Sequence, residues 1–325
     1  MPPAIRATAL RKSYPGSTAP ALDGFDLTVP PGTVHGLLGP NGAGKTTAVR
    51  ILATLLRPDS GQAEIDGLDI VTRAGDVRRR IGLIGQQAAL DEVLDGRANL
   101  VLFGRLLHLS PADARHRAAE LLEQFDLVEA AGRAVGAYSG GMRRRLDIAV
   151  GMILAPAVLF LDEPTTGLDP RGRAEVWAAV RTLVAAGTTV LLTTQYLDEA
   201  DQLAARISVL AAPRGGGGRV IAEGTPDELR ARIGGDRIEV VVRHPDDLAA
   251  AAAVVAGVAG APADVDTDLR RAAAPVADRM AALAATLTGL SRAGVDAEDL
   301  SVRRPTLDEV FLQLTDEAAR TEVPA

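Results

Sequence analysis

A glycine-rich segment that ends in a lysine and two threonines carries the residues best suited to chemistry. In chain order they are Gly39, Pro40, Asn41, Gly42, Ala43, Gly44, Lys45, Thr46 and Thr47. The glycines allow backbone N–H groups to close around phosphate oxygens, and the N-terminus of a helix that starts here adds partial positive charge. We therefore predict that Lys45 reaches the β- and γ-phosphates of a nucleotide and that the Thr46 hydroxyl binds Mg²⁺.

A pair of carboxylates follows an apolar run further along the chain. Residues 158–161 are all apolar, and Asp162 and Glu163 come directly after them. If this run is a buried strand, both acids lie at its carboxyl end, where open α/β sheets bind their ligands. We predict that Asp162 holds Mg²⁺ through water and that Glu163 polarises an attacking water. The competing interpretation is a strand that ends in two solvated acids.

A third segment, made of Ser139, Gly140 and Gly141, precedes a predicted helix. The serine and the two glycines expose the helix N-terminus, which makes a second anion site. One phosphate-binding loop holds one nucleotide, so this site lacks a phosphate unless it borrows one. The other interpretation is that Ser139 only caps the helix. The arginines at 143–145 lie off the apolar face of the helix and are expected to be solvated.

The strands and helices that position these segments follow from the apolar pattern. Short runs that are apolar on both faces indicate buried parallel strands covered by helices, the arrangement of an α/β domain. They are residues 34–38, 81–84, 158–161 and 190–192. A helix is predicted over residues 47–56, directly after the phosphate-binding segment, which is the context that this motif requires.

Two changes of pattern indicate the domain organisation. Residues 88–155 show helical patterns and no convincing strand, so we interpret them as a helical insertion. After Gly224 the composition shifts, and a capped helix start at Thr225 begins a mixture of strands and alanine-rich helices. The predicted architecture is an α/β domain over residues 1–225 and a small α+β domain over residues 226–325.

The composition excludes several classes of protein. The 325 residues carry a net charge of −7, and nonspecific nucleic-acid binding needs a basic surface, so we expect no nucleic-acid partner. There are no cysteines, which rules out disulfides and thiolate metal sites. The longest apolar stretch, residues 148–161, contains Pro156 and is shorter than the ~20 residues that a transmembrane helix needs. We therefore expect a cytoplasmic protein.

Taken together and in this order, the three segments resemble the motifs of the ATP-binding-cassette (ABC) ATPases. Residues 39–47 resemble the Walker A motif of that family, residues 158–163 its Walker B motif and residues 138–143 its signature motif. The resemblance implies a P-loop NTPase fold, an ABC-type nucleotide-binding domain with a helical insertion, and ATP and Mg²⁺ as ligands. It also implies a head-to-tail homodimer in which residues 139–141 of one subunit meet the γ-phosphate on the Walker A motif of the other.

Further family positions carry over one at a time. Tyr14 resembles the aromatic residue that stacks on adenine, and Gln86 resembles the Q-loop glutamine that senses Mg²⁺ and the attacking water. Asp169 lies in a segment that resembles the D-loop, which crosses to the partner subunit. This chain has Gln195 where the family usually has a histidine. Because a glutamine amide can donate a hydrogen bond but cannot take a proton, Glu163 must carry more of the mechanism.

A narrower resemblance is to the daunorubicin-resistance (DrrA-like) subfamily of drug-export ATPases. Residues 193–201 resemble that subfamily, in which glutamine at this place is usual, and so do residues 303–311. This resemblance implies ATP-driven export, a separately encoded integral-membrane permease as partner, and a place on the cytoplasmic face of the cell membrane. It further implies that residues 88–108 contact the permease.

Other functions remain open at this point. The ATPase could serve a lipid or polysaccharide exporter, or the chain could be a nucleotide-gated regulatory module with weak hydrolysis, which only Gln195 favours. An ABC ATPase that acts on ribosomes carries two cassettes. This chain has one segment that resembles Walker A, with Lys45, and one that resembles the signature motif, with Ser139. A DNA-repair or chromosome ATPase of the superfamily would need long heptad repeats, which are absent here. The transported molecule is not readable from the sequence.

Overall fold

The computed structural model describes residues 2–86, 88–212, 216–232 and 235–320. The chain divides into two compact units. The first runs up to Pro226 and includes residues 315–320, and the second is Asp227–Leu314. The second unit therefore ends earlier than the small domain proposed from the sequence. Residues 233, 234 and 321–325 of that proposed domain lie outside the described residues.

A six-stranded sheet forms the centre of the first unit, in the order β10-β9-β3-β8-β7-β6. Its strands are β3 (Val34–Leu38), β6 (Ile81–Ile84), β7 (Val158–Asp162), β8 (Thr189–Thr194), β9 (Arg206–Ala211) and β10 (Arg219–Gly224). All neighbouring pairs are parallel except β9 and β10. Every residue of β3, β7 and β8 is buried, which explains why these strands are apolar on both faces. The four predicted strands are all present.

A second, antiparallel sheet of the first unit was not predicted from the sequence. Its order is β2-β1-β4-β5, with β1 (Ile5–Lys12), β2 (Leu22–Val29), β4 (Ser60–Ile65) and β5 (Leu68–Asp69). The alternation of buried and exposed residues that would reveal β1 is broken between Ala7 and Leu10, where the register shifts and Ala9 has a φ of 50°. A bulge of this kind hides a strand from a search for period-two patterns.

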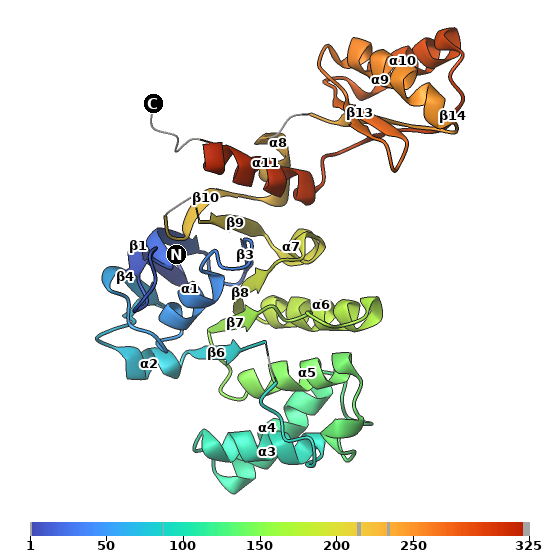
Figure 1. Cartoon of the computed structure of the whole chain (residues 1–325). Coiled ribbons are helices and arrows are strands. Elements are labelled where there is room, and N and C mark those ends of the chain that lie inside the picture. Colours follow the sequence, from blue (N-terminus) through green and yellow to red (C-terminus); the bar gives the residue numbers. More distant parts are fainter. Residues whose placement is uncertain (1, 87, 213–215, 233–234, 321–325) are drawn as a thin grey trace. The chain divides into compact units, whose positions relative to one another are not determined.

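Helices cover both faces of the central sheet (Figure 1). On one face, α1 (Lys45–Leu52) packs between the central sheet and the antiparallel sheet, and their apolar side chains form one core. On the other face lie α6 (Pro170–Ala185) and α7 (Leu197–Leu203). The short α2 (Ala74–Arg78) leads into β6. Because α1 starts at Lys45 and ends at Leu52, it is shifted and shorter than predicted.

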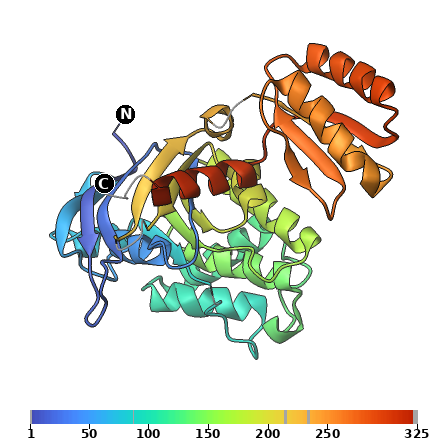
Figure 2. The ribbon, with the colours of Figure 1, turned by 45° about the horizontal axis from the view of Figure 1, so that its top comes forward.

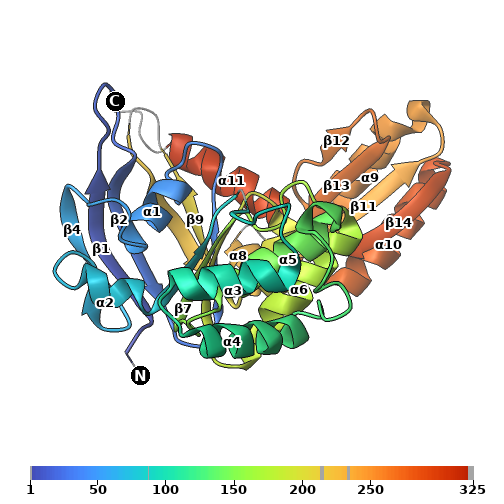
Figure 3. The ribbon, with the colours of Figure 1, turned by 90° about the horizontal axis from the view of Figure 1, so that it is seen from below.

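Three helices form the insertion between β6 and β7 (Figure 3). They are α3 (Gly96–Leu106), α4 (Pro111–Gln124) and α5 (Gly140–Gly151), with the 3₁₀ turn η1 (Val135–Ala137) before α5. Ser110 caps α4, because its side chain accepts a hydrogen bond from the Asp113 amide. The helix α5 contacts β6 and α6, so it connects the insertion to the central sheet.

The second unit is an antiparallel sheet in the order β12-β13-β11-β14, with α9 and α10 side by side on one face (Figure 2). Its strands are β11 (Arg237–Val242), β12 (Asp264–Asp266), β13 (Arg271–Pro275) and β14 (Ala297–Arg303). Its helical segments are α8 (Pro226–Arg232), η2 (Pro245–Asp247), α9 (Leu248–Ala259), α10 (Arg279–Ala293) and the start of α11 (Leu307–Arg320). Ile238, Val240 and Val242 alternate along β11 and face the helices in one apolar core.

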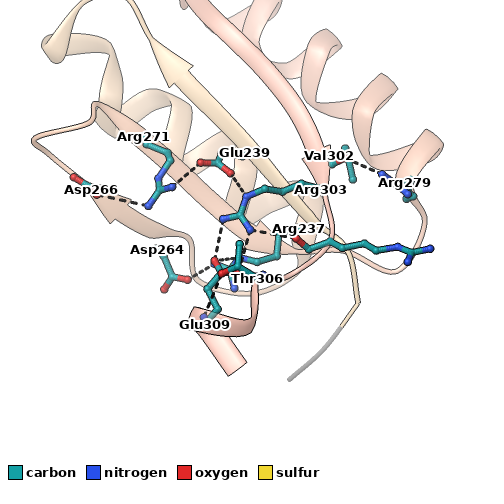
Figure 4. Close-up of polar contacts among 11 residues, drawn as sticks. Arg237, Glu239, Asp264, Asp266, Arg271, Arg279, Val302, Arg303, Thr306 and Glu309 are labelled. Carbon is teal, nitrogen blue, oxygen red and sulfur yellow. Dashed lines mark hydrogen bonds and ion pairs between the residues drawn. The ribbon is translucent and has the colours of Figure 1, made fainter. Parts of the chain in front are cut away.

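The opposite face of this second sheet carries a network of ion pairs (Figure 4). Glu239 accepts hydrogen bonds from Arg271 at 2.8 Å and from Arg303 at 2.6 Å. Arg303 also donates two bonds of 2.9 Å to Glu309, in the first turn of α11. The network therefore fixes the start of α11 to the sheet.

None of the helices in the described ranges is long and apolar enough to cross a membrane.

Candidate active site

The loop between β3 and α1 depends on a glycine at its end. Gly44 has a φ of 101° and is the N-cap of α1, and a Cβ at this position would lie 2.5 Å from the Ala21 carbonyl oxygen. Only glycine adopts this conformation and this close approach without strain. Within the described residues no side chain caps α1, so its first N–H groups are available to an anion.

Lys45 lies across this loop. Its Nζ donates to Gly39 O at 2.7 Å and to Pro40 O at 3.2 Å, and the residue is only 5% exposed. Burial lowers the pKa of Lys45, while the nearby charges of Glu163 and Asp162 act in the opposite direction. The lysine, the loop and the two acids therefore meet at one place.

Asp162 ends the buried strand β7 and faces Thr46. Its Oδ2 accepts from Thr46 Oγ1 at 3.3 Å, and its Oδ1 accepts from Thr193 Oγ1 at 2.5 Å. Thr193 is the register partner of Asp162 on β8, so the sheet itself brings them together. Sequence reasoning missed Thr193, although its place at the carboxyl end of a predicted strand is a usable signal.

Glu163 occupies a strained backbone position directly after β7. Its φ is 50°, which is costly for a residue with a Cβ. The turn is held because the Glu163 amide donates to Thr193 O at 3.0 Å and to Thr193 Oγ1 at 3.2 Å. The half-buried carboxylate accepts from Thr166 Oγ1 at 3.3 Å.

Gln86 and Glu163 line the same cavity of about 340 Å³, together with Gly140 of α5. Gln86 is exposed and follows the end of β6. Gln195 is also exposed and follows the end of β8, next to the strand that carries Asp162. The hydroxyl of Tyr14 lies 3.3 Å from Thr47 Oγ1, so its ring is beside the phosphate loop. Lys45, Thr46, Asp162 and Glu163 thus lie together at the carboxyl end of the central sheet, and Gln86 and Gln195 follow the carboxyl ends of β6 and β8.

The signature segment lines a second cavity, and its Gly140 borders the first cavity as well. Ser139 caps α5 by accepting from the Met142 amide at 3.2 Å. Ser139, Gly140 and Gly141 line a cavity of about 610 Å³ together with Asp169, and no residue of the 39–47 loop is among its described lining residues. The Asp169 carboxylate caps α6 by accepting from the Gly172 amide at 2.8 Å. The segment is therefore both a helix cap and part of a cavity.

The expectation that the arginines at 143–145 are solvated was wrong for Arg144 and Arg145. Arg144 is 7% exposed and pairs with the buried Asp147 at 3.0 Å. Arg145 donates to Phe125 O at 2.8 Å and pairs with Glu175 at 3.3 Å. The helical pattern places these arginines off the apolar face of α5, but loops and α6 cover that side as well.

Comparisons with known proteins identify the family of this chain. A family model described as "ABC transporter" matches residues 22–166, and one described as "ATP-binding protein DrrA1-3-like, C-terminal domain" matches residues 224–315. The chain is 62% identical to the daunorubicin resistance ATP-binding protein DrrA3 of Streptomyces coeruleorubidus, covering 94% of each chain. The chain belongs to the DrrA-like ATP-binding proteins of the ABC transporter family.

Other relatives and a solved structure support the same membership. This DrrA-like chain is 50% identical to the daunorubicin/doxorubicin resistance ATP-binding protein DrrA of Streptomyces peucetius, over 96% of this chain and 92% of that one. It is 43% identical to the Nod factor export ATP-binding protein I of Paraburkholderia xenovorans, over 76% and 78%. It also resembles CbiO1 of Clostridium perfringens, part of an ABC transporter complex, with a TM-score of 0.65 and 27% identity over 72% of this chain and 92% of that chain.

These findings establish the class of enzyme. The DrrA-like chain is an ABC-type ATPase, which binds ATP and couples its hydrolysis to transport. The expected fold, a P-loop ABC-type nucleotide-binding domain with a helical insertion and an accessory α+β domain, is confirmed.

Proposed function

We propose that this ATPase energises the efflux of a drug-like or antibiotic molecule through a separate membrane permease, on the cytoplasmic face of the cell membrane. The observation that carries the proposal is the identity of 62% to a daunorubicin resistance ATP-binding protein over nearly the whole chain, second unit included. The site described above supplies the groups that ATP hydrolysis needs. The permease supplies the path across the membrane.

The reaction is phosphoryl transfer to water. Lys45 and the N-terminus of α1 hold the phosphates, and Glu163 orients the attacking water as a general base. Gln86, which lines the same cavity as Glu163, positions that water, and Gln195 donates its amide to a γ-phosphate oxygen. Tyr14 lies at the loop end, where it can stack on the adenine.

Mg²⁺ fits the oxygen donors of this site. Thr46 Oγ1 and Asp162 Oδ2 lie 3.3 Å apart and face each other, with Gln86 as the further candidate ligand. The described residues contain no group of three acids or histidines that could hold a metal by itself. The Thr46 and Asp162 oxygens are the donor set expected for Mg²⁺, which binds one or two protein oxygens together with phosphate oxygens and water. When bound, Mg²⁺ neutralises charge on the phosphates during transfer.

The working form is a head-to-tail homodimer. The cavity at Ser139, Gly140 and Gly141 contains the N-terminus of α5, where Ser139 caps the Met142 amide, and none of the phosphate loop of its own chain. A γ-phosphate held by the partner's loop would accept hydrogen bonds from the other amides of this helix end. Asp169 lines the same cavity and is well placed for contact with the partner.

The permease contact lies on residues 88–108 of the helical insertion. Val93 is 86% exposed and Leu106 is 62% exposed, and Leu102 and Leu107 are exposed as well. Large apolar side chains gathered on one part of a surface mark an interaction site. The segment begins two residues after Gln86. The proposed permease contact is therefore close in the chain to a residue that positions the attacking water.

The experiment is a transport assay in cells that carry the chain and its permease. Daunorubicin accumulation should fall when both proteins are present and return to the control level with Lys45→Ala, which loses ATP affinity. If the purified complex hydrolyses ATP but neither exports daunorubicin nor responds to it, the drug assignment is wrong. Export of a lipid or saccharide by such a complex would favour the second candidate, which the similarity to a Nod factor export protein supports.

A further inference from the structure

The Arg144–Asp147 ion pair of α5 contacts the chain segments next to Gln86 and Glu163, the two residues proposed to position the attacking water. Arg144 donates to Gly85 O at 2.8 Å, directly before Gln86. It also donates to Pro164 O at 2.7 Å and to Asp162 O at 3.5 Å, the two neighbours of Glu163 in the chain. The same guanidinium thus joins the Q-loop to the catalytic loop.

Asp147 completes the arrangement from one turn further along α5. It accepts from Arg144 at 3.0 Å and accepts a backbone hydrogen bond from Ala89. Gly85 and Ala89 lie on either side of Gln86, so the pair holds the Q-loop at two points. Both side chains are buried, Arg144 at 7% and Asp147 at 4% exposed.

Burying a guanidinium and a carboxylate is costly, and such pairs contribute specificity of conformation more than stability. Here every acceptor of Arg144 outside its own helix is a backbone carbonyl of one of the two loops. The planar guanidinium has five N–H donors and can reach these acceptors together, whereas a lysine ammonium cannot.

We infer that the Arg144–Asp147 pair is a positioning device that couples the signature helix to Gln86 and Glu163 of the same subunit. The first turn of α5 carries Gly140 and Gly141, next to Ser139, so a partner nucleotide that engages this end acts on the helix that holds both loops. Binding of ATP at one nucleotide site therefore changes the positions of Gln86 and Glu163, which hold the attacking water at the other site. The inference rests on the proposed roles of Gln86 and Glu163 and on the proposed dimer.

Arg144→Lys is the test variant, because it keeps the charge and loses the fork of donors. ATP affinity, measured without turnover, should remain near the wild-type value. The turnover number should fall between about tenfold and a hundredfold, since small misplacement of a reacting group has effects of this size. Because Arg144 acts through Gln86, adding Gln86→Ala to Arg144→Lys should cost far less than Gln86→Ala costs in the wild type.

Arg117→Lys is the matched control. Arg117 lies on α4 and also donates to two backbone carbonyls, Met152 O at 2.9 Å and Ile153 O at 3.2 Å, but it touches neither loop. It should lower thermal stability by a similar amount, and its effect on turnover should add to that of Gln86→Ala. Strict additivity of Arg144→Lys with Gln86→Ala would overturn the inference.

Hydrogen exchange separates this inference from the proposed function. In the full chain, Arg144→Lys should speed amide exchange at residues 85–92 and 163–166, and Arg117→Lys should not. If exchange in these segments is unchanged, the pair does not hold the loops and the inference fails. If exchange changes but Gln86→Ala leaves turnover intact, the assigned role of Gln86 fails, and with it the coupling to catalysis.

Discussion

At the scale of single residues, two side chains to which we assign catalytic roles are held in unfavourable states. Lys45 is buried with a lowered pKa beside two carboxylates. Glu163 sits at a φ of 50°, which the two bonds to Thr193 make tolerable. Strain of this kind persists where the surrounding structure imposes it.

Glu163→Gln should retain ATP binding and trap the dimer, because the amide keeps the size of the side chain but cannot take a proton. Turnover should fall by about 10²- to 10⁴-fold, the usual contribution of a general base. The measurements are phosphate release and size-exclusion chromatography with ATP. Glu123→Gln, exposed on α4, serves as the control. Hydrolysis at the wild-type rate in Glu163→Gln would refute the role assigned to Glu163.

Gln195→Ala should slow turnover and leave ATP affinity unchanged, because the amide donates to a phosphate oxygen only as charge develops there. We expect a loss of about 10²- to 10³-fold, as for removal of one such donor. Steady-state kinetics and nucleotide titration separate the two quantities, with the exposed Gln62→Ala of β4 as the control. If turnover does not change, Gln195 takes no part in the mechanism.

At the scale of elements, caps and registers decide where the chemistry lies. Ser139 ends an extended segment and starts α5, and Asp169 does the same for α6. Both caps lie in one cavity, so two helix starts define the surface that we assign to the partner nucleotide. In the second unit, Thr306 and Glu309 form a reciprocal cap of α11: each side chain accepts from the amide of the other.

Glu309 links that cap to the ion-pair network of Figure 4. Burial raises its pKa, but the bonds from Arg303 and Thr306 and the charge of Arg237 outweigh burial and lower the pKa to about 2. The unfolded chain has the ordinary value of 4.5, so it binds more protons between these values. The stabilising contribution of Glu309 is therefore fully present above pH 4.5 and is lost as the pH falls toward 2.

Glu309→Gln tests this contribution, because glutamine keeps the cap and removes the charge. The free energy of unfolding of the second unit should fall by ~1.5–3 kcal/mol near neutral pH, the range of a hydrogen bond to a charged group. Between pH 4.5 and 2 the variant should lose less stability than the wild type. Amide exchange in β11 reports this locally. Glu298→Gln, in an exposed pair with Arg270, should have little effect, and equal acid sensitivity of all three proteins would contradict the assignment.

At the scale of the whole molecule, nucleotide chemistry and the accessory domain belong to different units. Every residue assigned to ATP lies before Pro226, whereas the DrrA-like C-terminal match begins at residue 224. The two units have separate apolar cores. We propose that the second unit serves dimerisation or the stability of the permease complex rather than hydrolysis.

A chain that ends at Gly224 should therefore bind ATP with unchanged affinity but recover less permease when the complex is purified. A chain that ends at Leu314 is the matched control, because it keeps the second unit and removes only the part that clusters with the first. The measurements are nucleotide titration and the ratio of the two subunits after purification. Normal assembly and transport by the Gly224 chain would dispose of the proposed role.

Much of this protein was determined by local sequence. The phosphate loop, the acids after β7 and the serine before α5 could be found because each needs particular residue types next to a strand or a helix. The central strands could be found because strands buried on both faces must be apolar. The family resemblance, and the glutamine at position 195 that is usual in its narrower branch, also followed from short segments.

The hydrogen-bond and ion-pair partners of the buried polar groups are set by the tertiary structure and could not be found from the sequence. Arg144 looked solvated because its helix pattern cannot show that β6, the catalytic loop and α6 cover that side of α5. Thr193 meets Asp162 only through the pairing of β7 with β8. The antiparallel sheet was hidden by a bulge in β1, and Ser139 proved to lie in a cavity apart from its own phosphate loop. Contacts between residues far apart in the chain depend on packing, which local patterns do not encode.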